Sequence, residues 1–578
     1  MFNPSHLLGI FSAFNASHFE TLDFTALAGA AQPNRLGGVV QMRPFAIKDG
    51  GVDSLAQRER KVEGTELNVG PMSSQGTIRV RPNGKLLFVA SARQAYMNLL
   101  YGKWLDFDGS PLRYSFGDYN VTLSYRPSMR HRFDLNAYFG QDRASYTEGA
   151  HLMHVRLNWL NYAAEASWRV MDKTWQLTQR LVVSGYQNDF RLRQAGQKMS
   201  LPSHIRQYGY QAEWSCNSWQ IGGSYSLYQI LPQSPQIEST YTQIETDRQE
   251  KGVAHEANVY AGWQYDWHDG QWVLKPEGRV TYYRDVDQKS WFSISPMLTL
   301  SWQAAPQHRL GVQLSVANQY VQQTGFTSLG LPTEFWFSAS RELKPQRAEG
   351  LSLLYDGQTP NKAWAFTANA YVKRLHHQKE YKDNVLDLIN EAYSLNTSLL
   401  QGQGLNYGFG VQLTRQSGPV TGWVGYAFGR SLRKFPELRE RSSYPANHER
   451  VHEFNLVATW QALKRVTFTC SAVFASGTPF TSANEFYLMN GYVVAQYGKH
   501  NGCHLSWYKR VDMAANVDLK QKRQRHFRHG FNVSLFNAFG FNNPLFYRLR
   551  IRRDGNFRFA PVCFLKYPLP SFSYYIKY

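Results

Sequence analysis

The chain has 578 residues with a net charge of +20, and 15% of its residues are aromatic against 18% charged. No apolar run is long enough for a spanning helix, which excludes a helical membrane protein. The charges are spread along the whole length, with one short basic cluster at 520–528. We interpret that cluster as a solvated turn and expect no nucleic-acid partner.

The first fifty residues differ from the rest of the chain. Apolar residues around Leu27 are followed by P-N-R-L-G-G-V-V-Q-M at 33–42. The adjacent glycines Gly37 and Gly38 indicate a backbone that needs positive φ or close packing. The start, M-F-N-P, has neither the basic nor the apolar region of a signal peptide, so we expect the chain as given to lack its beginning.

From about residue 65 to the end, apolar and polar residues alternate with the period of a β-strand. Val121, Leu123 and Tyr125 alternate with Thr122 and Ser124, and the same pattern recurs near residues 133–139, 312–317, 453–460 and 511–520. Helical periodicity is nearly absent. The pattern predicts an all-β chain.

Turn signals separate these segments and give a strand count. Ten short connections are expected at 82–84, 127–131, 171–174, 216–218, 267–270, 305–308, 356–362, 417–420, 462–464 and 521–525. Longer polar stretches lie between them, such as 229–254, 322–347, 373–405 and 476–507. Short periplasmic turns alternating with long outer loops are typical of a transmembrane antiparallel β-barrel. Ten such turns imply about 22 strands, the size of plugged outer-membrane transporters. The irregular turn spacing argues against a propeller.

The last eight residues, S-F-S-Y-Y-I-K-Y, read as a strand that ends the chain. One face carries Phe572, Tyr574, Ile576 and Tyr578, and the other carries Ser571, Ser573 and Lys577. A closed barrel needs such a strand because its last strand must pair with its first. An edge strand of a soluble sheet is the alternative interpretation.

With these motifs in view, the chain resembles the TonB-dependent outer-membrane receptors, in the branch common among Bacteroidota. P-N-R-L-G-G at 33–38, with Pro33, Gly37 and Gly38, is similar to the motif that closes the plug domain of that family. The C-terminal strand resembles the family's assembly signal, with Tyr578 where Phe is most frequent. The remaining matches, in chain order, are A-S-A-R-Q-A-Y-M-N-L-L (90–100), G-Q-G-L-N-Y-G-F-G-V-Q-L (402–413), G-P-V-T-G-W-V-G-Y (418–426), Y-P-A-N-H-E-R-V-H (444–452), S-G-T-P-F (476–480), Y-K-R-V-D (508–512) and F-N-A-F-G-F-N-N-P (536–544).

The resemblance implies two units, a C-terminal remnant of the plug at 1–48 and an outer-membrane barrel at 49–578. It implies uptake of a scarce, bulky nutrient such as a siderophore, cobalamin, an oligosaccharide or a peptide, in the outer membrane of a Gram-negative cell. Outer-membrane lipid and the barrel assembly machinery are implied partners, and a surface lipoprotein is a further option. The energy-transducing protein TonB is a partner only if the missing N-terminus exists.

Two other functions stay open at this point. One is a passive porin-like or non-transporting barrel, and the other is a secreted basic β-protein that binds glycans. We find no catalytic motif, and we expect neither an enzyme nor a cofactor. Ligand-binding residues are not identified.

Two local features are candidates for ligand contact. The adjacent His376 and His377 point in different directions on an extended segment, which argues against a metal site. The loop aromatics at 335–337 and 486–487 either stack on a ligand or pack within the loops.

Overall fold

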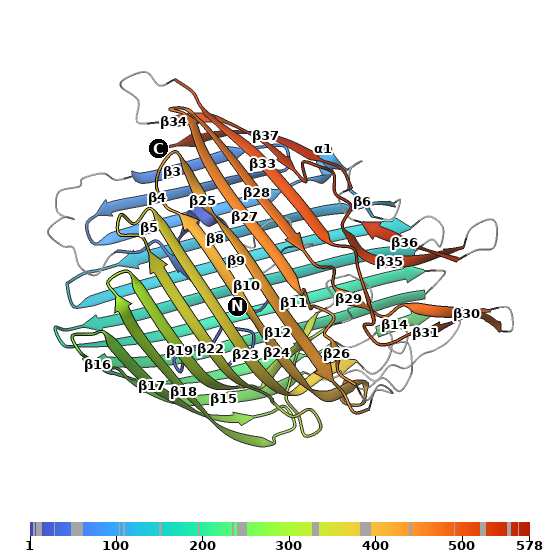
Figure 1. Ribbon diagram of the computed structural model, residues 1–578, viewed down its shortest axis with the longest axis horizontal. Coiled ribbons are helices and arrows are strands. Elements are labelled where there is room, and N and C mark those ends of the chain that lie inside the picture. The colour runs from blue at the N-terminus through green and yellow to red at the C-terminus, as the bar shows by residue number, and fades with distance from the viewer. Residues whose placement is uncertain are drawn as a thin grey trace.

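The computed structural model describes residues 1–3, 6, 14–27, 29–47, 62–102, 105–107, 110–148, 153–194, 197–233, 236–239, 251–325, 334–381, 395–437, 442–489, 492–520, 527–551, 557–563 and 566–578. Within these ranges, no helix has the length and apolar character needed to cross a membrane. Strands account for nearly all of the regular structure (Figure 1).

One closed antiparallel barrel dominates the fold (Figure 1). Its strand segments in the described residues are β3 (Val62–Val69), β4 (Ser73–Asn83), β5 (Leu86–Ala95), β8 (Arg113–Tyr125), β9 (His131–Glu148), β10 (Met153–Met171), β11 (Trp175–Gln194), β12 (Gln197–Cys216), β13 (Trp219–Leu231), β14 (Gln236–Ser239), β15 (Gly252–Trp263), β16 (Tyr265–Trp267), β17 (Trp272–Arg284), β18 (Ser290–Ala305), β19 (His308–Gln319), β22 (Gln346–Gln358), β23 (Trp364–Tyr381), β24 (Leu399–Arg415), β25 (Val420–Lys434), β26 (Tyr444–Pro445), β27 (His452–Leu463), β28 (Val466–Ala475), β33 (Tyr508–Asp518), β34 (Arg528–Phe536) and β37 (Leu569–Lys577).

Three of the spanning strands are interrupted. Segments β13 and β14 both pair with β12, β15 and β16 both pair with β17, and β26 and β27 both pair with β25. Each of these pairs of segments is therefore one strand, and the barrel has 22 strands. The predicted all-β barrel of about 22 strands is confirmed.

The barrel closes between its first and last strands. Strand β37 pairs with β34 on one side and with β3 on the other, where Glu66 lies opposite Lys577. Phe572 and Tyr578 point outward and are 53% and 40% exposed, whereas Ser573 is buried on the inner side. Because both edges of β37 are paired, no open edge remains at the C-terminus.

The short turns lie where the sequence predicts them. Nine of the ten predicted turns connect consecutive barrel strands within the described residues, and the tenth, at 521–525, lies outside them. The predicted loop at 373–405 is too long, because β23 continues to Tyr381 and β24 begins at Leu399. A bulge between Leu375 and Gln378 breaks the alternation there, which hides the strand from pattern analysis.

The long loops carry structure of their own. Their short helices and hairpins are α1 (Asn98–Tyr101), α2 (Leu395–Ser398), β6 (Asp106–Phe107) with β7 (Ser110–Pro111), β20 (Val321–Thr324) with β21 (Phe335–Ser338), β29 (Pro479–Phe480) with β32 (Cys503–His504), β30 (Ala483–Met489) with β31 (Tyr492–Tyr497), and β35 (Pro544–Ile551) with β36 (Phe557–Cys563).

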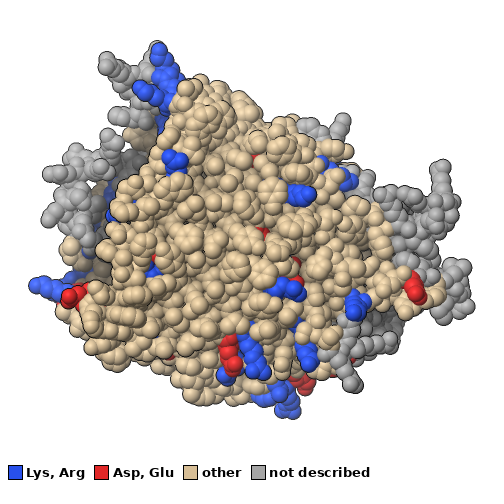
Figure 2. All heavy atoms as spheres, in the orientation of Figure 1, with Lys and Arg blue, Asp and Glu red and all other residues tan. Residues whose placement is uncertain are grey.

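The two faces of the barrel wall differ in chemistry. Outward-pointing Val259, Phe292 and Ile294 are 65%, 68% and 60% exposed. On the side of the barrel that Figure 2 displays, the outer wall carries few charged side chains. The inner face carries polar side chains, among them the fully buried Ser124 and Thr281. An apolar exterior around a polar interior is the arrangement that a lipid bilayer requires of a barrel.

The described residues of 1–47, called here the N-terminal segment, lie inside the barrel. This segment contains the 3-10 turn η2 (Ala16–His18) and a two-stranded sheet of β1 (Phe19–Thr25) and β2 (Val39–Pro44). Its side chains and carbonyls bond to inward-facing residues of strands far apart on the barrel, from β4 to β23. It therefore occupies the lumen.

Candidate functional site in the barrel lumen

A buried histidine of the N-terminal segment is held between two aspartates of the wall. His6 Nδ1 lies 2.9 Å from Asp142 Oδ2, and its Nε2 lies 3.5 Å from Asp118 Oδ2. Arg93 Nε donates to the same Asp118 oxygen at 2.7 Å, and Tyr114 Oη donates to Asp142 Oδ1 at 2.7 Å. Burial alone would lower the pKa of His6, but hydrogen bonds and charges from both aspartates outweigh it and raise that pKa. The arrangement favours the imidazolium form.

A second histidine is bound to hydroxyl groups instead of carboxylates. His18 Nε2 lies 3.0 Å from Thr122 Oγ1, and Ser91 Oγ lies 3.1 Å from His18 Nδ1. Burial, followed by the charge of Arg79, lowers the pKa of His18 to about 4. His18 is therefore neutral near pH 7, and the two histidines of one segment have opposite protonation preferences.

Asn34 anchors the middle of the segment to the wall. Its Nδ2 lies 3.1 Å from Glu256 Oε1 and 3.2 Å from Thr281 Oγ1. Arg279 donates from one amino group to Asn34 Oδ1 at 2.9 Å and from the other to the carbonyls of Ala30 and Gln32. Asn34 and Arg279 are 6% and 4% exposed. These bonds pair both amino groups of a buried guanidinium with the segment, so removing the segment would leave these two groups without those hydrogen bonds.

A buried lysine holds the far side of the segment. Lys373 Nζ, on β23, donates to the carbonyls of Ala26 at 2.8 Å and Leu36 at 3.2 Å. Gln319 Oε1 of β19 accepts from the amide of Leu36 at 3.0 Å. Anchors from β4 round to β23 thus fix the described residues between 15 and 36 against a large part of the inner wall.

The predicted plug-end residues lie in the same segment. Gly38 has φ +113°, and a Cβ there would lie 2.7 Å from the carbonyl oxygen of Thr25. Only glycine fits that backbone and that space. A Cβ at Gly37 would meet nothing within 4 Å, and Pro33 is exposed beside the buried Asn34. The assignment of these three residues to a plug end stays a prediction.

The aromatic residues at 335–337 belong to the packed mouth of the barrel. Phe335 and Phe337 are buried against Leu343, Leu395 and Leu399. Trp336 packs in the main core instead. Packing among loops is therefore what the structure shows for these three residues. Of the other aromatic pair, Tyr487 is exposed, and its hydroxyl bonds to Glu485 and Gln496.

The adjacent histidines lie at the bulge of β23 and have different partners. His377 Nδ1 is 3.0 Å from the carbonyl of Pro345, and His376 Nε2 is 3.8 Å from Glu349 Oε2. Across the described ranges, no group of three or more His, Cys, Asp or Glu side chains is arranged to hold a metal ion. All four cysteines are free thiols.

Sequence reasoning missed the anchoring residues. Asn34 and Arg279 are 245 positions apart, and Lys373 is 337 positions from Leu36. The only signal was indirect, because Arg279 and Lys373 occupy polar positions in alternating strands. Such positions predict the lumen side but not the partner.

A family model described as TonB dependent receptor-like, beta-barrel matches residues 85–543. A solved structure of the outer-membrane ferripyoverdine receptor of Pseudomonas aeruginosa is similar, with 9% identity, a TM-score of 0.63, and coverage of 96% of this chain and 75% of that one. The FrpB iron transporter from Neisseria meningitidis has 11% identity, a TM-score of 0.64, and coverage of 97% and 87%. The siderophore receptor PiuA from Acinetobacter baumannii has 10% identity, a TM-score of 0.62, and coverage of 95% and 84%.

At these identities the likeness to solved structures shows the fold alone. No curated protein sequence matches the chain.

Proposed function

The chain belongs to the TonB-dependent receptor-like β-barrel family of the Gram-negative outer membrane, and we propose that it imports a scarce, bulky nutrient with energy delivered through TonB. The candidate nutrients are a siderophore, cobalamin, an oligosaccharide or a peptide. The iron compounds named for the similar receptors belong to those proteins, and they make an iron chelate one candidate among these.

The observation that carries this proposal is the bonding of the N-terminal segment to the lumen wall. A barrel of 22 strands leaves a wide lumen that a plug must fill. We assign residues 1–48 to the C-terminal part of such a plug and residues 49–578 to the barrel. The anchors at His6, His18, Asn34 and Lys373 support that assignment.

The strength of these anchors explains why transport would need energy. A typical hydrogen bond contributes about 0.5–1.5 kcal/mol net, and one to a charged group about 1.5–3 kcal/mol. The bonds of Arg279, Lys373 and His6 are charge-assisted and buried. Displacing the segment would break several of them together, which thermal motion does rarely. A pull transmitted by TonB would supply the work.

Genetics can test this proposal without knowledge of the nutrient. The gene is deleted in its host, and growth is measured with iron chelates, cobalamin, oligosaccharides or peptides as the limiting source. We expect a defect on one source, rescue by the intact gene, and the same defect in a strain without TonB. Normal growth on every source, or uptake that persists without TonB, would contradict the proposal, and the second result would favour a passive channel.

If the native chain is longer at its N-terminus, we propose that the residues before Met1 contact TonB. Mass spectrometry of the protein from a detergent-extracted outer-membrane fraction tests this. Peptides upstream of Met1 would support coupling, and a native start at Met1 would argue against it.

A further inference from the structure

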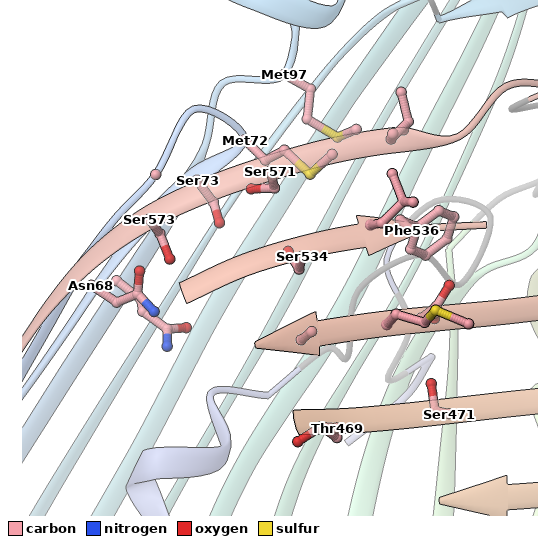
Figure 3. A pocket seen from close by; sticks show the side chains of 17 residues that line it. Asn68, Met72, Ser73, Met97, Thr469, Ser471, Ser534, Phe536, Ser571 and Ser573 are labelled. Atoms are coloured by element: carbon pink, nitrogen blue, oxygen red, sulfur yellow. The ribbon is translucent and has the colours of Figure 1, made fainter. Parts of the chain in front are cut away.

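A cavity of about 300 Å³ lies against the inner wall where the first and last strands meet (Figure 3). Strands β3 and β4 line it on one side of the seam, and β28, β33, β34 and β37 line it on the other. The anchors described above hold the N-terminal segment to strands from β4 to β23. The cavity therefore centres on the part of the wall outside that range.

Hydroxyl groups dominate the polar lining. They come from six residues on four strands: Ser73, Thr469, Ser471, Ser534, Ser571 and Ser573. The amides of Asn68 and Gln75 add two further polar groups from β3 and β4. Figure 3 shows Ser73, Ser571 and Ser573 along one wall of the cavity, with Ser534, Ser471 and Thr469 on the neighbouring strands.

These polar groups are available to a ligand. Within the described part of the chain, the side chains of Asn68, Gln75, Thr469, Ser471 and Ser534 form no hydrogen bond with another residue. The nearby strands β8 and β9 differ. There Thr122 donates to Asn136 at 2.9 Å and Ser124 donates to Asp134 at 2.6 Å. These five polar side chains of the seam are thus uncommitted, whereas Thr122 and Ser124 on β8 are already bonded to the wall.

The cavity carries no unpaired charge. None of its lining residues is Lys or Arg, and its one carboxylate is Asp512. Asp512 accepts from Arg510 Nε at 2.8 Å and from the amide of Asn537 at 2.9 Å. A bound anion would meet no free cation here, and a bound cation would meet a carboxylate that already has its partner.

One end of the cavity is apolar. Met72, Met97, Phe536 and Leu569 lie there, and Figure 3 places Met72 and Met97 together above Ser571. Met72 lies in the connection from β3 to β4, Phe536 ends β34, and Leu569 begins β37, so this end faces the long loops. A ligand entering from the loops would meet an apolar rim and then a hydroxyl-lined floor.

We propose that the seam cavity binds part of an uncharged, polyhydroxylated ligand of the chemical class of a neutral oligosaccharide. The C–H faces of a sugar ring suit the apolar rim, and its hydroxyls suit the serines, threonine and amides, each of which can donate and accept. The volume is at the lower end for ligand pockets, so only part of a bulky nutrient enters. This inference rests on the proposed function and selects one of its nutrient classes.

Binding can be measured on the full chain, purified in a detergent without a sugar head group. The probes are neutral glucan, mannan and galactan oligosaccharides, with ferric citrate as the anionic comparison, and the readout is saturation-transfer NMR with calorimetry. In Ser471→Phe and Ser534→Phe, a phenyl ring fills the cavity. Thr467→Phe is the matched control, because Thr467 lies on β28 at the same inward parity as Thr469 and bonds to Gln461 outside the cavity.

We expect at least one neutral oligosaccharide to bind, and both filled variants to weaken it about tenfold or more, which corresponds to about 1.4 kcal/mol. Thr467→Phe should bind like the parent. Ser471→Ala, which removes a hydroxyl without filling space, should weaken binding less. Heat-modifiable gel mobility checks that each variant is folded.

The proposal is overturned if no neutral oligosaccharide binds, or if the filled variants bind the oligosaccharide as tightly as the parent does. It is also overturned if filling the cavity weakens only the binding of ferric citrate. Growth assays separate this result from the proposed function. TonB-dependent growth that persists in the filled variants refutes the cavity assignment only, whereas growth that never depends on TonB refutes the transport proposal.

Discussion

The indole of Trp336 lies edge-on to the phenyl ring of Phe2, with ring centroids 5.1 Å apart and ring planes at 69°. Trp336 belongs to the β20–β21 hairpin at the mouth, and Phe2 belongs to the N-terminal segment in the lumen. The guanidinium of Arg35 lies 5.6 Å from the same indole centroid. A movement of the hairpin therefore alters contacts of the segment directly, which gives a physical connection between the outer mouth and the lumen.

Trp336→Ala should loosen the N-terminal segment without unfolding the barrel. Removing a buried Trp side chain costs about 3–5 kcal/mol in packed cores, and here the loss falls on the contact between the hairpin and the segment. Hydrogen exchange should become faster in residues 15–36 and stay unchanged in strands such as β10. Tyr487→Ala, in an exposed loop hairpin, is the control. Unchanged exchange in the segment of Trp336→Ala would show that the two parts are not coupled.

His18 should make docking of the segment weaker in acid. The docked pKa of His18 is about 4, below its ordinary 6.5, so the neutral form is bound more tightly. This contribution is fully present above pH 6.5 and is lost as the pH falls toward 4, by about 3 kcal/mol over that range. Protection factors of residues 15–25, corrected for intrinsic exchange, should fall between pH 6.5 and 4. In His18→Gln, that fall should largely disappear.

His6 gives the docking of the same segment the opposite pH dependence. Its pKa is raised in the docked state, so its contribution is present below pH 6.5 and is lost as the pH rises through the raised value. His6→Gln should remove this loss on the alkaline side and leave the acid-side fall of His18 in place. If the protection of the segment changes with pH in both variants as it does in the parent, both assignments are wrong.

Much of the barrel could be predicted from the sequence, and the lumen contacts could not. Alternation and turn residues are local signals, and Pro82-Asn83-Gly84 identifies a hairpin without knowledge of the rest of the chain. The bulge at His376 breaks alternation for only a few residues, yet it hid the end of β23. A local interruption is enough to defeat a local pattern.

The site depends on pairs that no local pattern encodes. Asn34 and Arg279 meet because the closed barrel brings β17 next to the N-terminal segment. The seam cavity likewise needs β3 and β37 to pair, which brings Asn68 and Ser573 to one space. Nothing in the flanking sequence of Phe335 distinguishes a packed loop aromatic from one that stacks on a ligand. These features follow from closure and not from composition.

Gly38→Ala should destabilise the β1–β2 sheet selectively. The positive φ and the 2.7 Å approach of a Cβ to Thr25 make alanine strained there, at a cost of about 1–3 kcal/mol. Gly37→Ala is a matched control one residue away, because its Cβ would meet nothing within 4 Å. Hydrogen exchange in residues 19–25 and 39–44 should be faster in Gly38→Ala only. Equal exchange in both variants would refute the requirement for glycine at position 38.

Adjacent residues of β37 should differ sharply in their tolerance of charge. Phe572 is 53% exposed on the outer face and stacks on Phe531 with centroids 5.0 Å apart, whereas Ser571 lines the cavity inside. A lysine on the lipid face costs up to about 2–4 kcal/mol, but a lysine toward the lumen stays solvated. Phe572→Lys should therefore reduce the amount of folded, heat-modifiable barrel in the outer-membrane fraction, and Ser571→Lys should not.

A third variant, Phe572→Leu, probes the proposed recognition of Phe572, Tyr574, Ile576 and Tyr578 by the assembly machinery. It keeps the outer face apolar but removes the aromatic ring. Full assembly of Phe572→Leu alongside failure of Phe572→Lys would assign the effect to lipid contact and exclude a requirement for the aromatic ring at this position.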